Sequence, residues 1–462
     1  MAGRLTDTVN VLVPVGALGT GVRAQDLAAG IALGAHVIAC DAGSTDSGPA
    51  YLATGKSKYA RDAIKTDLAL LMKAQATSGL PLLIGSCGTS GCDAALDWTR
   101  DIALEIAQDL NIRPRIALLY SEQQPAMMEA MAKDGRITPL APLIDSEPGR
   151  FAACDRIVAL MGPEPYIAAL EAGADIILGG RTTDTAVIAA VPIMRGAGLG
   201  PAWHSGKIAE CGGQATVNPR DGGVLIRVGR DAFEIEPLST GNACSTATVS
   251  AHMLYENSDP FRLVEPGGIL DVSNARYADV DGRVVAVTGS VFEPRPYTMK
   301  LEGAAGTAFQ TIMLVGIKDP AVLAEVDRFV AQMHHILTGR VVAAMGDRAG
   351  EFDISLRPYG WNAVSGEVVG DAASPREIGL LFVATAATQE IATQIAKTCN
   401  PYFFHMPLEM NAELPSYAFP FSPSEIERGQ VFEFRLNHVV AIDDPLALVR
   451  TEYVDWGART DA

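Results

Sequence analysis

A group of acidic and hydroxyl side chains follows an apolar run near the N-terminus of the chain. The run ends in "CDAGSTDSG", residues 40–48, which carries Asp41, Ser44 and Asp46. A carboxyl group can accept or donate a proton, and a hydroxyl can hold a polar ligand by a hydrogen bond. We therefore predict that Asp46 is a catalytic acid or base and that Asp41 and Ser44 bind the substrate.

A second group follows a later apolar run, in "GGRTTDTA", residues 179–186. The planar guanidinium of Arg181 suits a carboxylate or a phosphate, and the carboxylate of Asp184 suits a general base. An ion pair between these two side chains at the start of a helix is an equally good interpretation. We predict that Arg181 binds the substrate and that Asp184 is catalytic, with the structural ion pair as the alternative.

A third group, "GSCGTSGCD" at residues 85–93, precedes an expected helix. Backbone N–H groups at the start of a helix favour a bound phosphate or carboxylate. We predict that Ser86, Thr89 and Ser90 bind the substrate here. Cys87 is a candidate catalytic nucleophile because a helix start can lower the pKa of a thiol. Burial of a small residue at a crowded turn is the favoured alternative for Cys87.

These stretches match no standard cofactor motif. The glycines of "GALGTG", residues 16–21, have the wrong order for G-x-G-x-x-G, and residues 85–93 lack the lysine of a P-loop. We therefore expect no NAD site. Cys244, His252 and Glu256 have a spacing that matches no trusted metal-ligand pattern, so we predict no metal site. We expect His252 and Glu256 to share one face of a helix.

The elements that must position these groups alternate in type over the first 200 residues. Apolar strand-like runs are separated by amphipathic segments, such as residues 92–111, where Trp98, Ile102 and Ile106 recur every four residues. Nearly continuous apolar strands between such helices indicate a parallel sheet with helices on both faces. We predict a Rossmann-like α/β domain, in which ligands bind beyond the carboxyl ends of the strands. The three groups should therefore meet at one edge of the sheet.

The remainder of the chain has a different pattern. Residues 206–300 are rich in strand-like runs, with a hairpin signal at Asp281-Gly282, and the later residues mix helices and strands. The predicted fold class is thus α/β, with the N-terminal Rossmann-like sheet followed by a mixed α+β C-terminal region. The predicted domains are residues 1–200 (Rossmann-like α/β), 201–340 (β-rich α+β) and 341–462 (C-terminal α+β).

Composition restricts the class of protein. The 462 residues are 48% hydrophobic and 19% charged, which is typical of a folded chain with an ample core. The net charge of -18 and the lack of a basic block argue against nucleic acid or an anionic membrane as a partner. The sequence contains no apolar run of 18 residues, and its odd number of cysteines, 7, favours reduced thiols. We expect a cytoplasmic protein.

Four stretches of the sequence, in order, together resemble the acyclic terpene utilisation AtuA family. They are "VIACDAGSTDSGPAYLATG", "GADIILGGRTTDTAVIAA", "SAHMLYENSDP" and "MKLEGA". The resemblance runs from near residue 10 to at least residue 330. It implies cytosolic catabolism of small acids, including CoA thioesters. It also implies a set of candidate pocket residues, namely Asp41, Ser44, Asp46, Arg181 and Asp184.

We expect an enzyme that acts on a small carboxylate or an acyl-CoA, in which CoA would be part of the substrate. Hydration or dehydration, a lyase reaction, is favoured because it needs an anion-binding group, an acid/base pair and donors to an oxyanion. Two alternatives stay open. One is a non-catalytic binding or scaffold subunit with a separate small partner chain, and the other is a Cys87-dependent acyl transferase or hydrolase. The apolar content leads us to expect a homo-oligomer.

Overall fold

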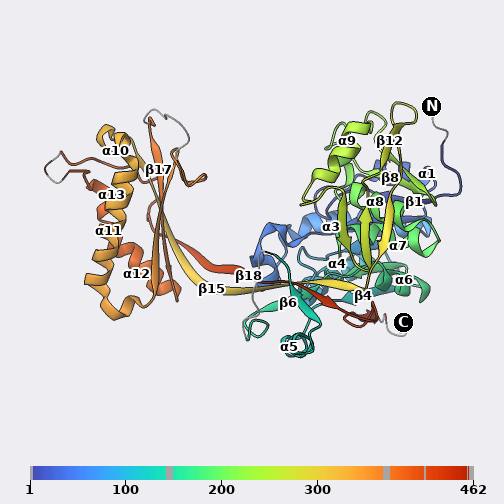
Figure 1. Ribbon diagram of the computed structural model, residues 1–462, viewed down its shortest axis with the longest axis horizontal. Coiled ribbons are helices and arrows are strands. Elements are labelled where there is room, and N and C mark those ends of the chain that lie inside the picture. Colours follow the sequence, from blue (N-terminus) through green and yellow to red (C-terminus); the bar gives the residue numbers. More distant parts are fainter. Residues whose placement is uncertain are drawn as a thin grey trace. The chain divides into compact units, whose positions relative to one another are not determined.

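The chain forms two compact units (Figure 1). Unit 1 is built from residues 1–305 and 434–462, and unit 2 from residues 306–433. The three domains given above stay a prediction. This computed structural model describes residues 4–141, 149–367, 375–409, 411, 413–454 and 456.

A ten-stranded mixed sheet forms the centre of unit 1. Its middle consists of five parallel strands whose residues are almost all buried, as expected for a sheet that is covered on both faces. The strand β7 lies between β3 and β4, although β4 comes earlier in the chain. The five strands, in their order across the sheet, are β1 (Val9–Val13), β2 (Val37–Asp41), β3 (Leu82–Gly85), β7 (Ile176–Gly179) and β4 (Ile116–Tyr120).

Antiparallel strands extend both edges of this parallel region. The strand β19 (Arg450–Tyr453) pairs with β4 at one edge. The hairpin predicted at Asp281-Gly282 is confirmed, since it joins the antiparallel strands β12 and β13. The fold is therefore a mixed α/β fold with a large mixed sheet. The strands beyond β1 are β8 (Val224–Val228), β9 (Ala232–Pro237), β13 (Val285–Thr288) and β12 (Arg276–Asp279).

Helices cover both faces of the parallel strands. Alternate residues of each strand enter two separate cores, because successive side chains of a strand point to opposite faces. Leu12 packs in the core with α3 (Arg61–Ser78) and α4 (Asp93–Asp109), whereas Val11 packs in the core with α7 (Asp184–Met194) and α8 (Leu199–Ala209). The other helices of unit 1 are α1 (Ala24–Ala32), α2 (Pro49–Thr54), α5 (Pro125–Lys133), α6 (Glu164–Glu171) and α9 (Thr246–Ala251).

One apolar strand of the alternating pattern lies outside the large sheet. This strand, β6 (Arg156–Ala159), pairs antiparallel with residues 301–304 of β15 (Thr298–Ile317). Its apolar sequence resembles that of the parallel strands, so composition does not reveal its partner. The remaining strands of unit 1 are β5 (Ile137–Pro139), which pairs with β18 (Ile426–Ala441), and the three-stranded sheet of β10 (Arg262–Glu265), β11 (Gly268–Asp271) and β14 (Val291–Pro294).

Unit 2 packs helices on one face of an antiparallel sheet. Residues 309–317 of β15 pair with β17 (Ile378–Ala386), and burial alternates along β17 as expected for a sheet with one covered face. The other elements of this unit are β16 (Phe352–Tyr359), α10 (Pro320–Ala324), α11 (Val326–Met345), α12 (Gln389–Cys399) and α13 (Tyr402–His405). None of the helices in the described part of either unit has both the length and the apolar character that crossing a membrane requires.

Candidate functional site

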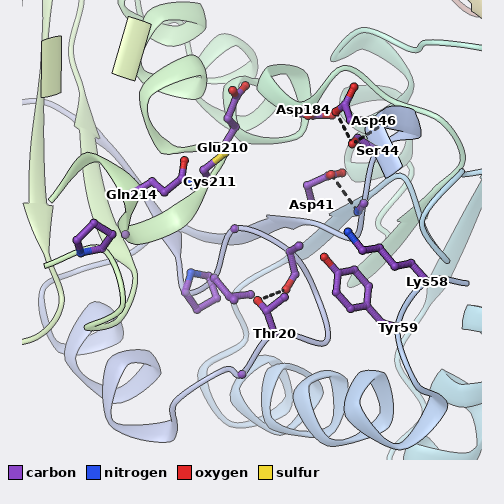
Figure 2. A pocket seen from close by; sticks show the side chains of 18 of the residues that line it. Thr20, Asp41, Ser44, Asp46, Lys58, Tyr59, Asp184, Glu210, Cys211 and Gln214 are labelled. Atoms are coloured by element: carbon purple, nitrogen blue, oxygen red, sulfur yellow. Dashed lines mark hydrogen bonds between the residues drawn. The ribbon is translucent and has the colours of Figure 1, made fainter. Parts of the chain in front are cut away.

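A pocket of about 790 Å³ opens in unit 1 where the parallel strands β1, β2, β3 and β7 end (Figure 2). Parallel strands present their carboxyl ends at one edge of a sheet, so the loops that follow them meet there. This is the edge at which the three sequence groups were expected to converge. The predicted site residues that line the pocket are Asp41, Ser44, Asp46, Thr89 and Asp184.

Asp41 ends strand β2 and is buried. Its Oδ2 accepts a hydrogen bond of 3.0 Å from the backbone N–H of Gly43, and its Oδ1 has no hydrogen-bond partner among the described residues. A Cβ atom at residue 85 would lie 2.8 Å from this Oδ1, so Gly85 leaves room for the carboxyl group. Burial, and then the charge of Asp184, raise the pKa of Asp41 well above its ordinary value. Asp41 therefore favours its protonated form.

Ser44 and Asp46 form the turn that follows Asp41. The Ser44 hydroxyl donates to Asp46 Oδ2 at 2.5 Å and accepts from the Asp46 backbone N–H at 3.3 Å. This exchange caps the short 3₁₀ turn Thr45–Ser47 and holds the Asp46 carboxylate at the exposed side of the pocket.

Asp184 is the first residue of α7, and its side chain is 31% exposed toward the pocket. Partial burial raises the pKa of this carboxyl group, the guanidinium of Arg181 at 3.4 Å opposes the increase, and the nearby charge of Asp46 adds to it. Figure 2 shows Asp46 and Asp184 on the same side of the pocket. Asp41 and Asp184 therefore retain a proton more readily than an isolated aspartate.

Arg181 lies behind these carboxyl groups rather than in the pocket lining, and it is 5% exposed. Its Nε donates to Glu302 Oε2 at 3.1 Å, and its Nη1 donates to Ser86 Oγ at 3.2 Å. Its Nη2 lies 3.4 Å from the hydroxyl of Thr45, which itself donates to Glu302 at 2.9 Å. The guanidinium is thus directed at protein groups. Asp184, the partner in the alternative ion pair, lies 3.4 Å from this guanidinium, and Glu302 is a closer partner that the sequence did not suggest.

The loop after β3 is held in an uncommon backbone conformation. Ser86 and Thr89 have φ angles of 46° and 84°, in the left-handed region that costs energy for residues with a side chain. Thr89 lines the pocket, and its hydroxyl accepts a 2.9 Å hydrogen bond from the backbone N–H of Lys58. Ser90 is buried with its hydroxyl against Cys92 Sγ at 3.4 Å. In this loop, therefore, Thr89 faces the pocket, whereas Ser86 and Ser90 support its walls.

Cys87 is completely buried and does not line the pocket. Helix α4 begins only at Asp93, so Cys87 is too far from the helix start to gain from it. Burial and the charge of Asp41 raise the pKa of the Cys87 thiol well above its ordinary value, which is opposite in direction to the expected lowering. These surroundings keep Cys87 a neutral thiol and correspond to the favoured alternative of a buried small residue.

Another wall of the pocket contains residues that were not predicted from the sequence. Glu210 and Cys211 follow α8 and line the pocket, and Figure 2 shows them to the left of Asp184 and Asp46. The side chain of Lys207 forms an ion pair with Glu210, and both groups are buried. These residues follow a helix, whereas the three groups predicted from the sequence follow strands. The available sequence signal was an acid and a thiol directly before a glycine pair, in "ECGG".

His252 lies near this wall, but the expected helix around it is shorter than the sequence suggested. Helix α9 ends at Ala251, and a 3₁₀ turn covers His252–Leu254. Glu256 has a φ angle of 57°, outside any helix, so the prediction that His252 and Glu256 share a helix face is wrong. The run continues to look helical in sequence because Met253 and Leu254 are good helix formers.

Exposed cations also line the pocket. Lys58 is exposed, and its Nζ donates to Ser47 Oγ at 3.0 Å. Arg220 is also exposed and lines the pocket, whereas Arg23 is held by Asp26 and Asp221. The pocket thus combines carboxyl groups that favour protonation with exposed positive charge, an arrangement that can hold an anion and move a proton.

Comparison with protein-family models matches residues 41–420 to the family described as Acyclic terpene utilisation family protein AtuA. Comparisons with curated proteins and with solved structures find no match. The matched range covers most of the chain and includes the carboxylate group Asp41, Asp46 and Asp184, together with Glu210 and Cys211. The chain therefore belongs to the acyclic terpene utilisation AtuA family.

Proposed function

We propose that the protein is a hydro-lyase that removes water from, or adds water to, a small carboxylate or its CoA thioester. The observation that carries this proposal is that Asp41 and Asp184 line the same pocket and that the pKa values of both carboxyl groups are raised. Carboxyl groups with perturbed pKa values in one site supply an acid and a base near neutral pH. We further propose that the parallel strands serve this site as in Rossmann-like domains, with the ligand beyond their carboxyl ends.

The two carboxyl groups would have complementary roles. The Asp184 carboxylate would remove a proton from the carbon next to the substrate carbonyl, and protonated Asp41 would give its proton to the departing hydroxyl. A carbon–carbon double bond forms as the carbon–oxygen bond breaks, and one water leaves. The reverse sequence adds water. Asp46, whose charge contributes to the raised pKa of Asp184, would help Asp184 to bind a proton.

The anionic part of the substrate would bind at Lys58 and Arg220. Both side chains are exposed at the pocket, whereas the guanidinium of Arg181 is already held by Glu302 and Ser86. An ammonium or a guanidinium attracts a carboxylate or a phosphate, so these two side chains suit a free acid as well as the phosphates of CoA. The pocket volume of about 790 Å³ falls within the range of small-molecule sites.

The experiment that tests this proposal measures loss or gain of water on a panel of hydroxyacyl and unsaturated acids and their CoA thioesters, by mass spectrometry. We expect Asp184→Asn and Asp41→Asn to reduce turnover by about 10²- to 10⁴-fold while the melting temperature stays near that of the wild type. Asp109→Asn is the matched control, because Asp109 is a surface residue of α4 that pairs with Lys65.

The outcomes separate the proposal from the non-catalytic alternative. Turnover that survives both Asp184→Asn and Asp41→Asn would show that this carboxylate pair is not the acid and base. A wild-type protein that turns over no member of the panel but captures a separate chain from cell extract would favour a binding or scaffold subunit. Size-exclusion chromatography with light scattering would test the expected homo-oligomer in the same preparation.

A further inference from the structure

Three side chains of metal-binding type meet at the wall of the pocket. One ligand atom from each of Glu210, Cys211 and His252 lies within 4.8 Å of the other two. Glu210 and Cys211 come from the segment after α8 and line the pocket, and His252 comes from the turn after α9 (Figure 2 shows Glu210 and Cys211). Two separate segments therefore bring a carboxylate, a thiol and an imidazole into one small volume.

The imidazole of His252 provides an independent sign of a missing partner. His252 is only 5% exposed, and its Nε2 is buried with no hydrogen-bond partner in the part of the chain that the structure describes. The ring stacks on Tyr255, with the two ring centroids 5.5 Å apart, which restricts its orientation. A metal-binding histidine is characteristically held in a fixed orientation by the groups around it. A buried polar atom without a partner otherwise costs about 1–3 kcal/mol.

The charge around the cluster also suits a cation. The carboxyl groups of Glu210, Asp184 and Glu265 influence one another electrostatically, and Lys207 is the cation that faces Glu210. Lys207 bonds Oε1, which is one of the two carboxylate oxygens of Glu210. Three acidic side chains therefore lie near one ammonium group, and the oxygen atoms of such side chains can act as ligands for a divalent ion.

We propose that Glu210, Cys211 and His252 bind a zinc ion whose fourth position is open toward the pocket. Sulfur and nitrogen ligands favour zinc over magnesium or calcium, which prefer oxygen. Three protein ligands and one open position are typical of catalytic zinc sites. At ordinary zinc–ligand distances of about 2.0–2.3 Å the ligand atoms lie about 3.5 Å apart, so atoms that are now within 4.8 Å of one another would each approach by at most about 1.3 Å.

This site differs from the set of three residues whose spacing in the sequence matches no metal-ligand pattern. That set joins His252 to Cys244 and Glu256 by their spacing along the chain, whereas the fold joins His252 to Glu210 and Cys211. Binding would convert the Cys211 thiol to a thiolate and release one proton to solvent. Under the proposed hydro-lyase function, on which this role rests, the ion would polarise the oxygen of the departing hydroxyl or of the substrate carbonyl.

Metal binding can be measured without turnover. The full-length protein is stripped with a chelator, dialysed against zinc chloride, freed of excess metal and analysed by elemental mass spectrometry. We expect about one zinc per chain for the wild type, in line with a single three-ligand site. A parallel titration with cobalt chloride should give a thiolate-to-cobalt charge-transfer band. Addition of zinc in weak buffer should release about one proton per chain.

Variants of the cluster distinguish this site from adventitious binding. Cys211→Ser should abolish the charge-transfer band and the proton release, and His252→Gln should weaken zinc binding by at least about tenfold. Cys244→Ser is the matched control, because Cys244 is buried in the same unit but lies outside the cluster. Circular dichroism confirms that each variant is folded.

The proposal is overturned if the wild type retains no zinc, or if Cys211→Ser and Cys244→Ser bind cobalt with the same absorption as the wild type. If Cys211→Ser fails to fold, the wild-type charge-transfer band and the affinity of His252→Gln decide the question. Zinc binding without turnover would support this site and count against the hydro-lyase. Turnover by a zinc-free wild-type protein would support the hydro-lyase and refute the catalytic role of the ion.

Discussion

Replacement of Arg181 by methionine should destabilise unit 1, because it leaves the Glu302 carboxylate buried without its principal partner. The side chains of both residues are 6% exposed, and they contact at 3.1 Å. Burial favours the neutral acid, but the charges of Arg181 and then Lys300 outweigh it and lower the pKa of Glu302 from 4.5 to about 2. Because one pKa unit corresponds to about 1.36 kcal/mol, this lowering corresponds to about 3 kcal/mol of stability.

The typical cost of breaking a buried ion pair agrees with this free energy. Removal of one member of a buried ion pair typically costs about 3–5 kcal/mol. Lys300, 2.9 Å from Glu302 Oε1, would still stabilise the carboxylate, so we expect the lower end, about 3 kcal/mol. A carboxyl group with a lowered pKa contributes its stability above pH 4.5 and loses it as the pH falls toward 2. The difference between the wild type and Arg181→Met should therefore be largest at pH 7 and shrink below pH 4.5.

The assay is urea unfolding followed by tryptophan fluorescence, because Trp203 is buried in unit 1. The double variant Arg181→Met/Glu302→Gln should recover at least about 1 kcal/mol of the loss, since it removes the unpaired charge as well. Lys300→Met is the control and should cost less than about 1 kcal/mol, because its side chain is 42% exposed. An Arg181→Met loss below about 1 kcal/mol at pH 7 would refute the assignment of Arg181 to a structural ion pair.

Two further predictions concern stability. Burial lowers the pKa of His204 to about 3, so the neutral imidazole contributes its full stability above pH 6.5, and this stability is lost as the pH falls. Between pH 6.5 and pH 5 we expect the free energy of unfolding of the wild type, measured with urea, to fall by about 2 kcal/mol more than that of His204→Gln. Equal losses in the two proteins would contradict this prediction. Gly91→Ala should cost about 2–4 kcal/mol in thermal unfolding, because residue 91 has a φ of 65° and an added Cβ would lie 2.3 Å from the backbone nitrogen of Arg181. Gly196→Ala, with a φ of 80° but open space around it, should cost only the backbone strain of about 1–2 kcal/mol, and an equal effect of both substitutions would show that the close contact is unimportant.

Several features of the fold and the site could be predicted from local sequence. The apolar runs of β1, β2, β3, β4 and β7 identified strands that are buried on both faces. Because parallel strands end at one edge, the polar residues after β2 and β7 had to lie near each other. Asp41 and Asp184 accordingly line one pocket, although they are far apart in the sequence.

Contacts between distant segments could not be predicted in this way. The sequence gives no reason for Arg181 to contact Glu302 rather than a ligand, since the pairing follows from the position of β15 beside β6. The apolar composition of β6 is similar to that of the parallel strands, so it does not reveal that β6 pairs with β15. Cys211 and His252 come together only because α8 and α9 end near the same wall of the pocket.

The sequence by itself therefore determined the five parallel strands, several of the helices beside them, the family and the edge of the sheet at which the polar loops gather. Periodicity and strand polarity are local properties, and they fix which residues end each strand. The tertiary structure alone decided which of those residues face the pocket and which are enclosed. That choice changes the chemistry of each group, because burial raises the pKa of the Cys87 thiol and the charge of Arg181 stabilises Glu302 as a carboxylate.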